Sequence, residues 1–268
     1  MVAVKRYTTD CSVPEMLACF ISHEFEDGEE IGVGANLPIP RAASFLAHMT
    51  HAPNTVLILS YGKTSLPDVS VLGPLQSAFD FRKARWAEYY DRDEDMVTEA
   101  KRVNRGRFFI GALQVDKYGN SNLIGIGDNH SRLNLRGPGA VGTTSMTCYA
   151  KCYYIMLNSH NKCVFVEECD YISAVGWGEG GIDGRKKLAL PGGGPKYVLT
   201  PICIMDFEEM TKRMRLRSVH PGITIKQVVA NTGFELIIPD RVTTTEAVSE
   251  EELQLLRNRI DVDGVLRK

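Results

Sequence analysis

An apolar run that ends in polar residues is the first place in the sequence where side chains could do chemistry. Residues Val56–Leu59 are continuously apolar, as in a buried strand, and Ser60, Tyr61 and Gly62 follow directly. A strand holds its end rigidly while the following turn exposes side chains, so reactive residues are common at such positions. Ser60, Tyr61 and Gly62 are therefore candidate residues of a binding pocket.

A second candidate is the polar, glycine-rich segment Gly125–Ser145, which reads GIGDNHSRLNLRGPGAVGTTS. Its glycines leave backbone N–H groups bare, and such groups can bind a phosphate or a developing oxyanion. It is not a Walker loop, because no Gly-Lys-Ser/Thr follows, and no strand-helix-strand unit frames its G-x-G-x-x-G spacing. From spacing alone, a functional loop and an ordinary surface loop are both open. The polar side chains that precede the glycines are Asp128, Asn129, His130 and Arg132.

Four other groups of residues give weaker signals of function. The turn Asp116–Asn120 follows a strand, and Gly119 provides the positive φ that a tight hairpin needs. Gly192–Gly194 fits a lid, a hinge or a plain connection equally well. Cys148 and Cys152 are four residues apart, but no second pair completes a zinc site, so we expect no metal. The histidines show no Ser-His-Asp order, which gives a hydrolytic triad little support.

The elements that position these residues alternate between helix and strand in the first half. Apolar residues at helical spacing predict a helix between Pro14 and Gly28 and another over residues 41–51. Short strands are predicted from Glu30 onward and over Asn54–Leu59. Such alternation favours a parallel sheet that helices cover on both faces.

The chain changes character after a charged segment, Phe79–Arg107, for which we expect exposed helices packed against the sheet by Trp86, Tyr89 and Tyr90. Short apolar runs separated by Gly, Asn and Pro turns then predict more strands than helices. These runs are FFIGALQVDKYGN, SNLIGIG, CYYIMLN, KCVFVEEC and KYVLTPICIMDF.

Helical patterns return at Ile223–Phe234 and at Ser249–Ile260, where Ser249 can cap the helix and Glu252 can reach back to it. We therefore predict an α/β fold, with an open, mostly parallel sheet flanked by helices and a β-rich second half. The sequence has no repeat, low-complexity tract or long linker, so residues 1–268 are predicted to form a single domain.

The composition excludes several classes of protein. A net charge of -2 over 268 residues provides no basic surface to hold nucleic acid or anionic lipid. No apolar run is long enough to span a membrane, and the N-terminus lacks the apolar core of a secretory signal. The 7 cysteines, scattered over a long chain, fit free thiols in a reducing compartment. We expect a cytoplasmic protein without disulfides.

Motifs along most of the chain, taken together, resemble one family, the family I CoA-transferases. The similarity is to their second (β) subunit, especially of the glutaconate CoA-transferase type, and it runs from the first helix to the end of the chain. The order and spacing of the motifs are more specific than any one of them. They read GALQVDKYGNSN, IGIGDNHSRLNLRGPGAVG, CVFVEECDYISAVGW, LALPGGGPKYVLT and MRLRSVHPGITIKQVVANTGFEL.

This resemblance implies a CoA-transferase-like sheet and a partner. In the family, two related subunits or halves hold acyl-CoA in a cleft at their junction, and this chain would supply one half. The resemblance thus implies an obligatory α subunit, in a heterodimer or heterotetramer. It implies no permanently bound cofactor, because coenzyme A enters as part of the substrate.

The resemblance also reveals a departure at the strand end. In glutaconate-type β subunits a catalytic glutamate stands at the position that Ser60 occupies here. A transferase needs that carboxylate to attack the thioester, form a mixed anhydride and then hold CoA as a glutamyl thioester. The family's Gly-Gly-Ala segment, which stabilises the thioester oxyanion, is also altered, and Gly139 and Ala140 are the candidate oxyanion donors in its place.

A branch of the family fits this departure better: the two-subunit ring-opening hydrolases of bacterial steroid breakdown, whose β subunit also lacks the glutamate. The segments CVFVEEC and Ser218–Gly222 resemble that branch. We therefore expect hydrolytic opening of a cyclic 3-oxoacyl-CoA, with the catalytic acid in the α subunit. This chain would shape the pocket with Ser60, Tyr61, Gly62, Asn129, His130 and Arg132.

Two alternatives remain open. The chain could belong to a true CoA-transferase that moves CoA between carboxylic acids, with Glu167 or Glu168 as the nucleophile. It could also be a non-catalytic sensor of small molecules, because regulators use the same fold. A sensor would self-associate, whereas a β subunit needs a dissimilar partner.

Overall fold

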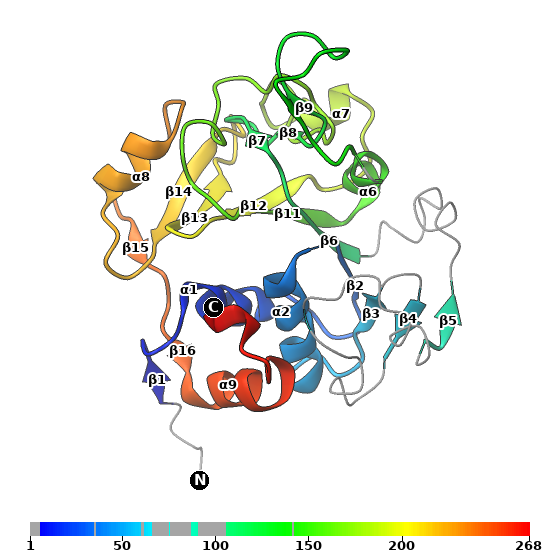
Figure 1. The fold of residues 1–268 in the computed structure, drawn as a ribbon, viewed down its shortest axis with the longest axis vertical. Coiled ribbons are helices and arrows are strands. Elements are labelled where there is room, and N and C mark those ends of the chain that lie inside the picture. The colour runs from blue at the N-terminus through cyan, green and yellow to red at the C-terminus, as the bar shows by residue number, and fades with distance from the viewer. Residues whose placement is uncertain are drawn as a thin grey trace. The chain divides into compact units, whose positions relative to one another are not determined.

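The computed structural model describes residues 6–34, 36–59, 62–65, 75, 87–90, 106–140 and 142–268. The chain divides into two compact units. The first comprises Met1–Met96 with Glu246–Lys268, and the second comprises Val97–Thr245 (Figure 1). No helix in these described ranges is long and apolar enough to cross a membrane. A single domain over residues 1–268 stays a prediction.

The first unit contains a strand-helix-strand arrangement. The strand β2 (Glu30–Val33) leads into α2 (Pro38–Met49), and β3 (Val56–Leu59) returns parallel to β2. The strand β4 (Gly62–Thr64) pairs antiparallel with β3, and β5 (Tyr89–Tyr90) pairs antiparallel with β4. Because β2 and β3 are parallel, their carboxyl ends lie at the same edge of the sheet.

The helix α1 (Val13–Ser22) begins with a capping box. The Ser12 hydroxyl accepts a hydrogen bond from the Glu15 amide at 3.2 Å, and the Glu15 carboxylate accepts one from the Ser12 amide at 2.9 Å. Pro14 lies in the first turn, where no backbone donor is needed. The helices α1 and α2 pack together, and their fully buried side chains include Leu17, Ile21, Phe45 and Leu46.

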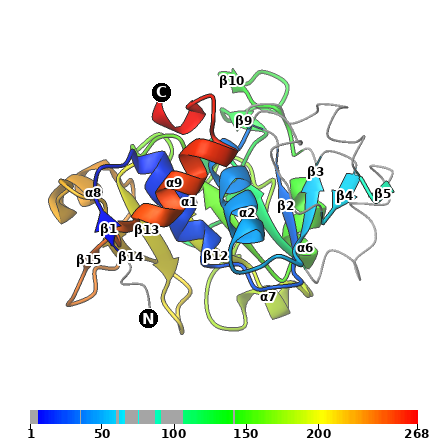
Figure 2. The same cartoon turned by 90° about the horizontal axis from the view of Figure 1, so that it is seen from below.

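The C-terminal segment completes the first unit. The strand β16 (Val248–Ser249) pairs antiparallel with β1 (Tyr7–Thr8) and leads into α9 (Glu250–Leu255). Ser249 caps α9, as the sequence predicts, by accepting a hydrogen bond from the Glu252 amide at 3.2 Å. A π-helical turn, Leu256–Ile260, and a 3₁₀ turn, Val265–Arg267, continue the chain beside α1 and α2 (Figures 1 and 2).

An ion pair fixes this C-terminal segment to α1. Arg257 donates to the two oxygens of the Glu15 carboxylate at 2.7 and 2.9 Å, and the Glu15 side chain is only 1% exposed. Burial opposes ionisation of Glu15, but hydrogen bonds from Arg257 and Ser12 outweigh it and hold the pKa of Glu15 below its usual value. The N- and C-terminal parts of the chain are therefore joined by a buried charge that has its partner.

The second unit is built on a sheet in which β6, β11 and β12 are parallel neighbours. The strands β13 and β14 continue it in antiparallel pairing, and β15 pairs parallel with β14. The bounds are β6 (Gly106–Ile110), β11 (Cys152–Met156), β12 (Pro195–Leu199), β13 (Cys203–Phe207), β14 (Met214–Val219) and β15 (Thr243–Thr244).

Shorter elements surround this sheet. They are β7 (Gln114–Val115), β8 (Ser121–Asn122), β9 (Gly125–Ile126), β10 (Leu135–Arg136), α6 (Thr143–Tyr149), α7 (Gly184–Lys187) and α8 (Ile225–Asn231). Alternate residues of the sheet strands, such as Tyr153 and Ile155, enter a core that also takes Val115 and Phe165 from the surrounding segments. The predicted α/β fold with a β-rich second half is confirmed.

Two details of the prediction are wrong. The run KCVFVEEC is not a strand, because the amides of Val164 and Phe165 bond to the Asn161 carbonyl at 3.1 and 2.9 Å, which curls the backbone into a turn. Phe165 retains only an isolated bridge to Val115. Tyr89 and Tyr90 form the strand β5 rather than a helix, and most of the predicted helical segment around them lies outside the described residues.

Candidate functional site

The strand end that the sequence singles out lies at the carboxyl end of β3. Gly62 is the first residue of β4 and lies opposite Leu59, so the chain reverses direction between these two residues. In parallel sheets, ligands bind outside the carboxyl ends of the strands. Ser60 and Tyr61 lie outside the described residues, and their roles stay predictions.

The polar residues Asn129, His130 and Arg132 lie on an exposed loop between β9 and β10, which pair antiparallel. The Asn129 side chain accepts a hydrogen bond from the Ser131 amide at 2.9 Å, and its carbonyl accepts one from the Arg132 amide at 2.9 Å. The His130 ring packs edge-on against Tyr171, with ring centroids 5.7 Å apart. Asn129 thus shapes the turn, while His130 and Arg132 present their side chains at its surface.

The glycine loop, residues Gly137–Gly142, follows β10 and leads into α6. Two of its amides donate to the preceding turn: Gly137 to the Ile124 carbonyl and Gly139 to the Leu123 carbonyl, both at 2.9 Å. A Cβ at Gly137 would lie 2.2 Å from the Leu123 carbonyl oxygen, so no other residue fits there without a shift of the backbone. Gly137 and Gly139 are therefore fixed against Ile124 and Leu123.

The two predicted oxyanion donors differ in their availability. The Gly139 amide is occupied by the Leu123 carbonyl. The Ala140 amide has no acceptor among the described residues, while its carbonyl accepts from the Thr143 amide at 2.8 Å. Of the two, only the Ala140 amide is open to bind a ligand oxygen.

Buried amide side chains, which sequence reasoning did not identify, support the turn that carries Leu123 and Ile124. Asn122, 0% exposed, donates from Nδ2 to Gln114 Oε1 and to the Gly125 carbonyl, both at 2.7 Å. Its Oδ1 accepts from the amides of Ile124 and Gly125 at 2.8 and 3.3 Å. Asn122 has no hydrogen-bonding capacity left, so the turn has one fixed geometry.

The turn at Asp116–Asn120 is the hairpin that the sequence predicts, between β7 and β8. The Asp116 carboxylate accepts from the Tyr118 and Asn120 amides at 2.8 and 3.0 Å and from Asn120 Nδ2 at 2.7 Å. Burial raises the pKa of Asp116 above its usual value despite these bonds. Asn120 Oδ1 accepts from the Gly176 amide at 2.9 Å, so this hairpin is a structural anchor.

The triple glycine Gly192–Gly194 is a packed connection rather than a lid. The Gly192 amide donates to the Cys148 carbonyl at 2.8 Å, and a Cβ at Gly193 would lie 2.0 Å from the Lys151 carbonyl oxygen. The buried Arg185 donates to the carbonyls of Gly192 and Thr147 at 2.9 and 2.7 Å. These bonds hold the connection closed against the end of α6.

The alternative nucleophiles Glu167 and Glu168 lie on the surface of the second unit. The Glu167 side chain is 62% exposed and forms an ion pair with Lys117. Glu168 is exposed as well. A covalent nucleophile is normally activated in a protected site, and neither residue has such surroundings among the described residues.

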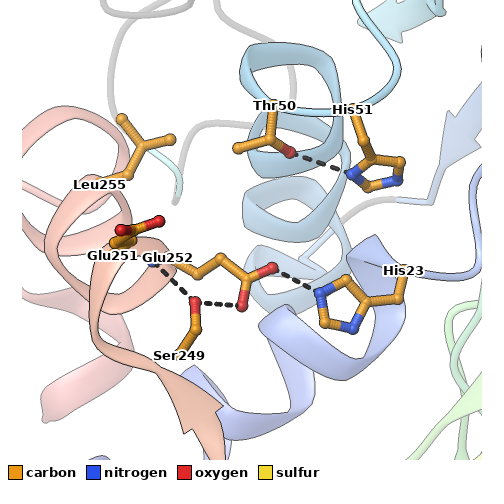
Figure 3. Close-up of a pocket in the computed structure, with 7 residues that line it drawn as sticks. All are labelled: His23, Thr50, His51, Ser249, Glu251, Glu252 and Leu255. Carbon is orange, nitrogen blue, oxygen red and sulfur yellow. Dashed lines mark hydrogen bonds and ion pairs between the residues drawn. The ribbon is translucent and has the colours of Figure 1, made fainter. Parts of the chain in front are cut away.

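The first unit also contains a pocket of about 610 Å³ (Figure 3). Its polar groups bond to one another: His23 Nε2 lies 2.5 Å from Glu252 Oε1, and Glu252 Oε2 accepts from the Ser249 hydroxyl at 2.6 Å. His23 precedes β2 and His51 precedes β3, so the pocket lies at the amino ends of these strands. It is at the opposite edge from Gly62. The lining residues are His23, Thr50, His51, Ser249, Glu251, Glu252 and Leu255.

The 7 cysteines are free, and burial raises the pKa of Cys203 to about 12, which keeps that thiol protonated. Within the described ranges, no group of three or more His, Cys, Asp or Glu side chains could hold a metal ion.

Comparison with known proteins defines the class. Residues 14–231 match the family "Coenzyme A transferase", so the chain belongs to the coenzyme A transferase family and is an enzyme chain. This confirms the resemblance that the motifs carry.

Particular relatives are components of two-subunit enzymes. The chain is 35% identical to the β subunit of 3-oxoadipate CoA-transferase from Pseudomonas knackmussii, over 92% of both chains. It is 32% identical to the β subunit of glutaconate CoA-transferase from Acidaminococcus fermentans, over 94% of both. The crystal structure of that glutaconate coenzyme A-transferase superposes with a TM-score of 0.84 over 98% of this chain and 99% of the other, which confirms the fold. The cholesterol ring-cleaving hydrolase IpdB subunit of Mycobacterium tuberculosis is 28% identical, over 92% of this chain and 94% of the relative.

Proposed function

We propose that this chain is the β subunit of a heteromeric enzyme that opens a cyclic 3-oxoacyl-CoA by hydrolysing a carbon–carbon bond. One observation carries the proposal: the sequence contains no carboxylate from Ser60 to Pro67, immediately after the strand end of β3. CoA transfer by way of a mixed anhydride and an enzyme thioester requires a carboxylate nucleophile there. Hydrolysis of a ring ketone does not require one on this chain.

The reaction then depends on an acid of the partner subunit. That carboxylate removes a proton from water, and the resulting hydroxide adds to the ring ketone to give a tetrahedral adduct. The adduct collapses with cleavage of the bond between the former ketone carbon and the carbon next to the thioester. The electron pair enters the thioester as an enolate, which is then protonated, and the former ketone becomes a carboxylate. Coenzyme A stays attached throughout.

In this scheme the present chain binds the substrate and stabilises the negative charge that develops on the thioester oxygen. The Ala140 amide donates to the thioester oxygen as its negative charge develops, which lowers the barrier because the donor is already in place. Asn129, His130 and Arg132 contact polar groups of the substrate from their exposed loop. Ser60, Tyr61 and Gly62 line the substrate pocket at the strand end.

The partners follow from the relatives. Two of them are named as the β subunit of a CoA-transferase, and another as a component of a ring-cleaving hydrolase. We expect a dissimilar α subunit that supplies the catalytic acid, in a heterodimer or heterotetramer. No permanently bound cofactor is expected, because coenzyme A arrives and leaves as part of the substrate.

Isotope labelling tests the proposal. The purified complex is incubated with a cyclic 3-oxoacyl-CoA in ¹⁸O-water, with and without an acceptor carboxylic acid. Hydrolysis places one ¹⁸O atom in the new carboxylate, leaves the thioester intact and needs no acceptor. If turnover required the acceptor and the product contained no ¹⁸O, the chain would belong to a transferase.

A true CoA-transferase is the second candidate, and the identities favour it. The two transferase relatives are 35% and 32% identical to this chain, against 28% for the ring-cleaving hydrolase relative. In that case the nucleophile must come from outside residues 60–67 or from the partner. Borohydride reduction during turnover cleaves an enzyme-bound thioester at its glutamate, so mass spectrometry would identify the residue.

A further inference from the structure

The segment CDYISAVGW contains a buried serine, Ser173, that forms hydrogen bonds with Leu123 and with Thr144. Ser173 is 4% exposed and lies 50 residues after Leu123 in the sequence. Its backbone amide donates to the Ser121 carbonyl at 2.9 Å, which fixes the segment beside β8. Its side chain and its carbonyl are therefore held in defined directions.

The first contact runs through the Ser173 hydroxyl. It accepts a hydrogen bond from the Leu123 amide at 3.0 Å and donates one to the Ser121 carbonyl at 3.0 Å. The Leu123 carbonyl in turn accepts the Gly139 amide at 2.9 Å. The Ser173 hydroxyl therefore fixes Leu123, which in turn binds the Gly139 amide. Gly139 directly precedes Ala140, whose amide is open.

The second contact runs through the Ser173 carbonyl. It accepts a hydrogen bond from the Thr144 hydroxyl at 2.6 Å. Thr144 lies in the first turn of α6, next to Thr143, whose amide bonds to the Ala140 carbonyl at 2.8 Å. Ser173 thus holds the chain on both sides of Ala140.

We propose that Ser173 is a positioning residue: by binding Leu123 through its hydroxyl and Thr144 through its carbonyl, it fixes the direction of the Ala140 amide. The inference rests on the proposed function, in which that amide stabilises the developing oxyanion. A donor that is displaced by a fraction of an ångström still leaves substrate binding intact but loses its fit to the transition state. The role of Ser173 is therefore seen in kcat and not in KM.

The test uses the assembled complex with variants of each contact. In Ser173→Ala the hydroxyl contact is lost, and in Thr144→Val the carbonyl contact is lost while Ser173 stays in place. We expect kcat to fall about 10- to 100-fold in Ser173→Ala and less in Thr144→Val, with KM within about twofold of the parent. Thr144→Ser keeps the hydroxyl that Thr144→Val lacks, so its kcat should equal that of the parent. Ser218→Ala, which removes a buried hydroxyl elsewhere in the same unit, is the control and should leave kcat unchanged.

Hydrogen–deuterium exchange gives a measurement that does not depend on activity. In Ser173→Ala, we expect the amides of Gly137 and Gly139 to exchange about tenfold faster or more, because their acceptors are no longer fixed, while the peptides of β12 and β13 exchange as in the parent. Faster exchange with unchanged kcat would overturn the positioning role, and so would an equal fall of kcat in Ser218→Ala. If the parent complex does not open cyclic 3-oxoacyl-CoA, the proposed function fails in the parent itself. The variants are then compared on the thioester reaction that the parent does catalyse.

Discussion

At the scale of single residues, two neighbouring amides of the glycine loop differ in whether they can donate a hydrogen bond to a ligand. The Gly139 amide is bonded to the Leu123 carbonyl, whereas the Ala140 amide is open among the described residues. The sequence predicts both as donors, because glycine spacing shows that a backbone is bare but not which amide is already bonded. The difference comes from the hydrogen bond between the Gly139 amide and the Leu123 carbonyl. These residues are far apart in the sequence, so the spacing of the glycines does not reveal their contact.

The identity of residue 60 should decide between hydrolysis and transfer. If Ser60 stands where a transferase has its glutamate, Ser60→Glu supplies the missing nucleophile. We expect this variant to gain acceptor-dependent CoA transfer and a covalent CoA adduct on this chain, measured by intact mass spectrometry. Ser60→Gln, which has the same shape without the charge, is the control and should form no adduct. An adduct in the parent protein would contradict the proposed hydrolysis.

Asn122 should contribute strongly to stability because all of its hydrogen bonds are made inside the protein. Asn122→Ala removes the acceptor of the Ile124 and Gly125 amides and one donor to Gln114 in a buried place, which costs about 3 kcal/mol of unfolding free energy. Urea unfolding of the purified protein measures the loss. Asn231→Ala, which removes one exposed hydrogen bond in α8, should cost less than about 0.5 kcal/mol. Equal losses in the two variants would contradict the role of Asn122.

At the scale of elements, local patterns predict the helices and the sheet strands because their signals lie within a few residues. The capped helix after Ser249 and the strand ending at Leu59 are examples. The run KCVFVEEC has the composition of a strand, but Asn161 binds its amides first and forms a turn. Ser173 carries no local signal, since Ser121, Leu123 and Thr144 are all far from it in the sequence. Asn122 bonds locally to Ile124 and Gly125, but its bond to Gln114 crosses the hairpin and has no local signal.

The contact between α1 and the C-terminal segment should depend on the charge of Glu15. The pKa of Glu15 is below its usual 4.5 in the folded protein, so its contribution is complete above that pH and is lost as the pH falls through the folded value. Glu15→Gln leaves Arg257 without its partner and should cost about 2 kcal/mol at neutral pH.

Unfolding curves measured between neutral pH and about pH 3 check this. The difference between the parent and Glu15→Gln should shrink below pH 4.5. Glu251→Gln, on the exposed side of α9, serves as the control and should match the parent at every pH. A difference for Glu15→Gln that stays constant with pH would show that the charge is unimportant.

The carboxyl edge of the second unit's sheet should be sensitive to acid for a different reason. Burial lowers the pKa of His160 to about 4, and its two ring nitrogens bond to the hydroxyls of Thr200 and Thr232, both at 3.1 Å. Between pH 6.5 and about 4 the unfolded chain binds a proton that folded His160 does not, so stability falls on acidification.

The expected loss from His160 over that interval is about 2 kcal/mol, measured by urea unfolding at each pH. Burial also lowers the pKa of His220, so part of the slope will remain in His160→Asn. His130→Asn, at an exposed loop, should keep the full slope. If His160→Asn kept the full slope as well, His160 would not be the group responsible.

At the scale of the whole molecule, the family and the fold are the features that the comparisons establish. The chain belongs to the coenzyme A transferase family along most of its length, and its fold matches that of glutaconate coenzyme A-transferase. The motifs of the family resemblance predict that Ser60, an uncharged residue, stands where transfer chemistry needs a carboxylate. If it does, the fold and the missing carboxylate together favour an enzyme whose acid lies on another chain.

The most direct test of the proposed hydrolysis is mass spectrometry of the complex purified from its source cells, first in its native state and then denatured after incubation with a cyclic 3-oxoacyl-CoA. We predict a stoichiometric, dissimilar second chain and no covalent CoA on this chain during turnover. A homo-oligomer without a partner would contradict the proposal and favour a sensor. A CoA adduct on Glu167, Glu168 or any other residue of this chain would contradict it in favour of a transferase.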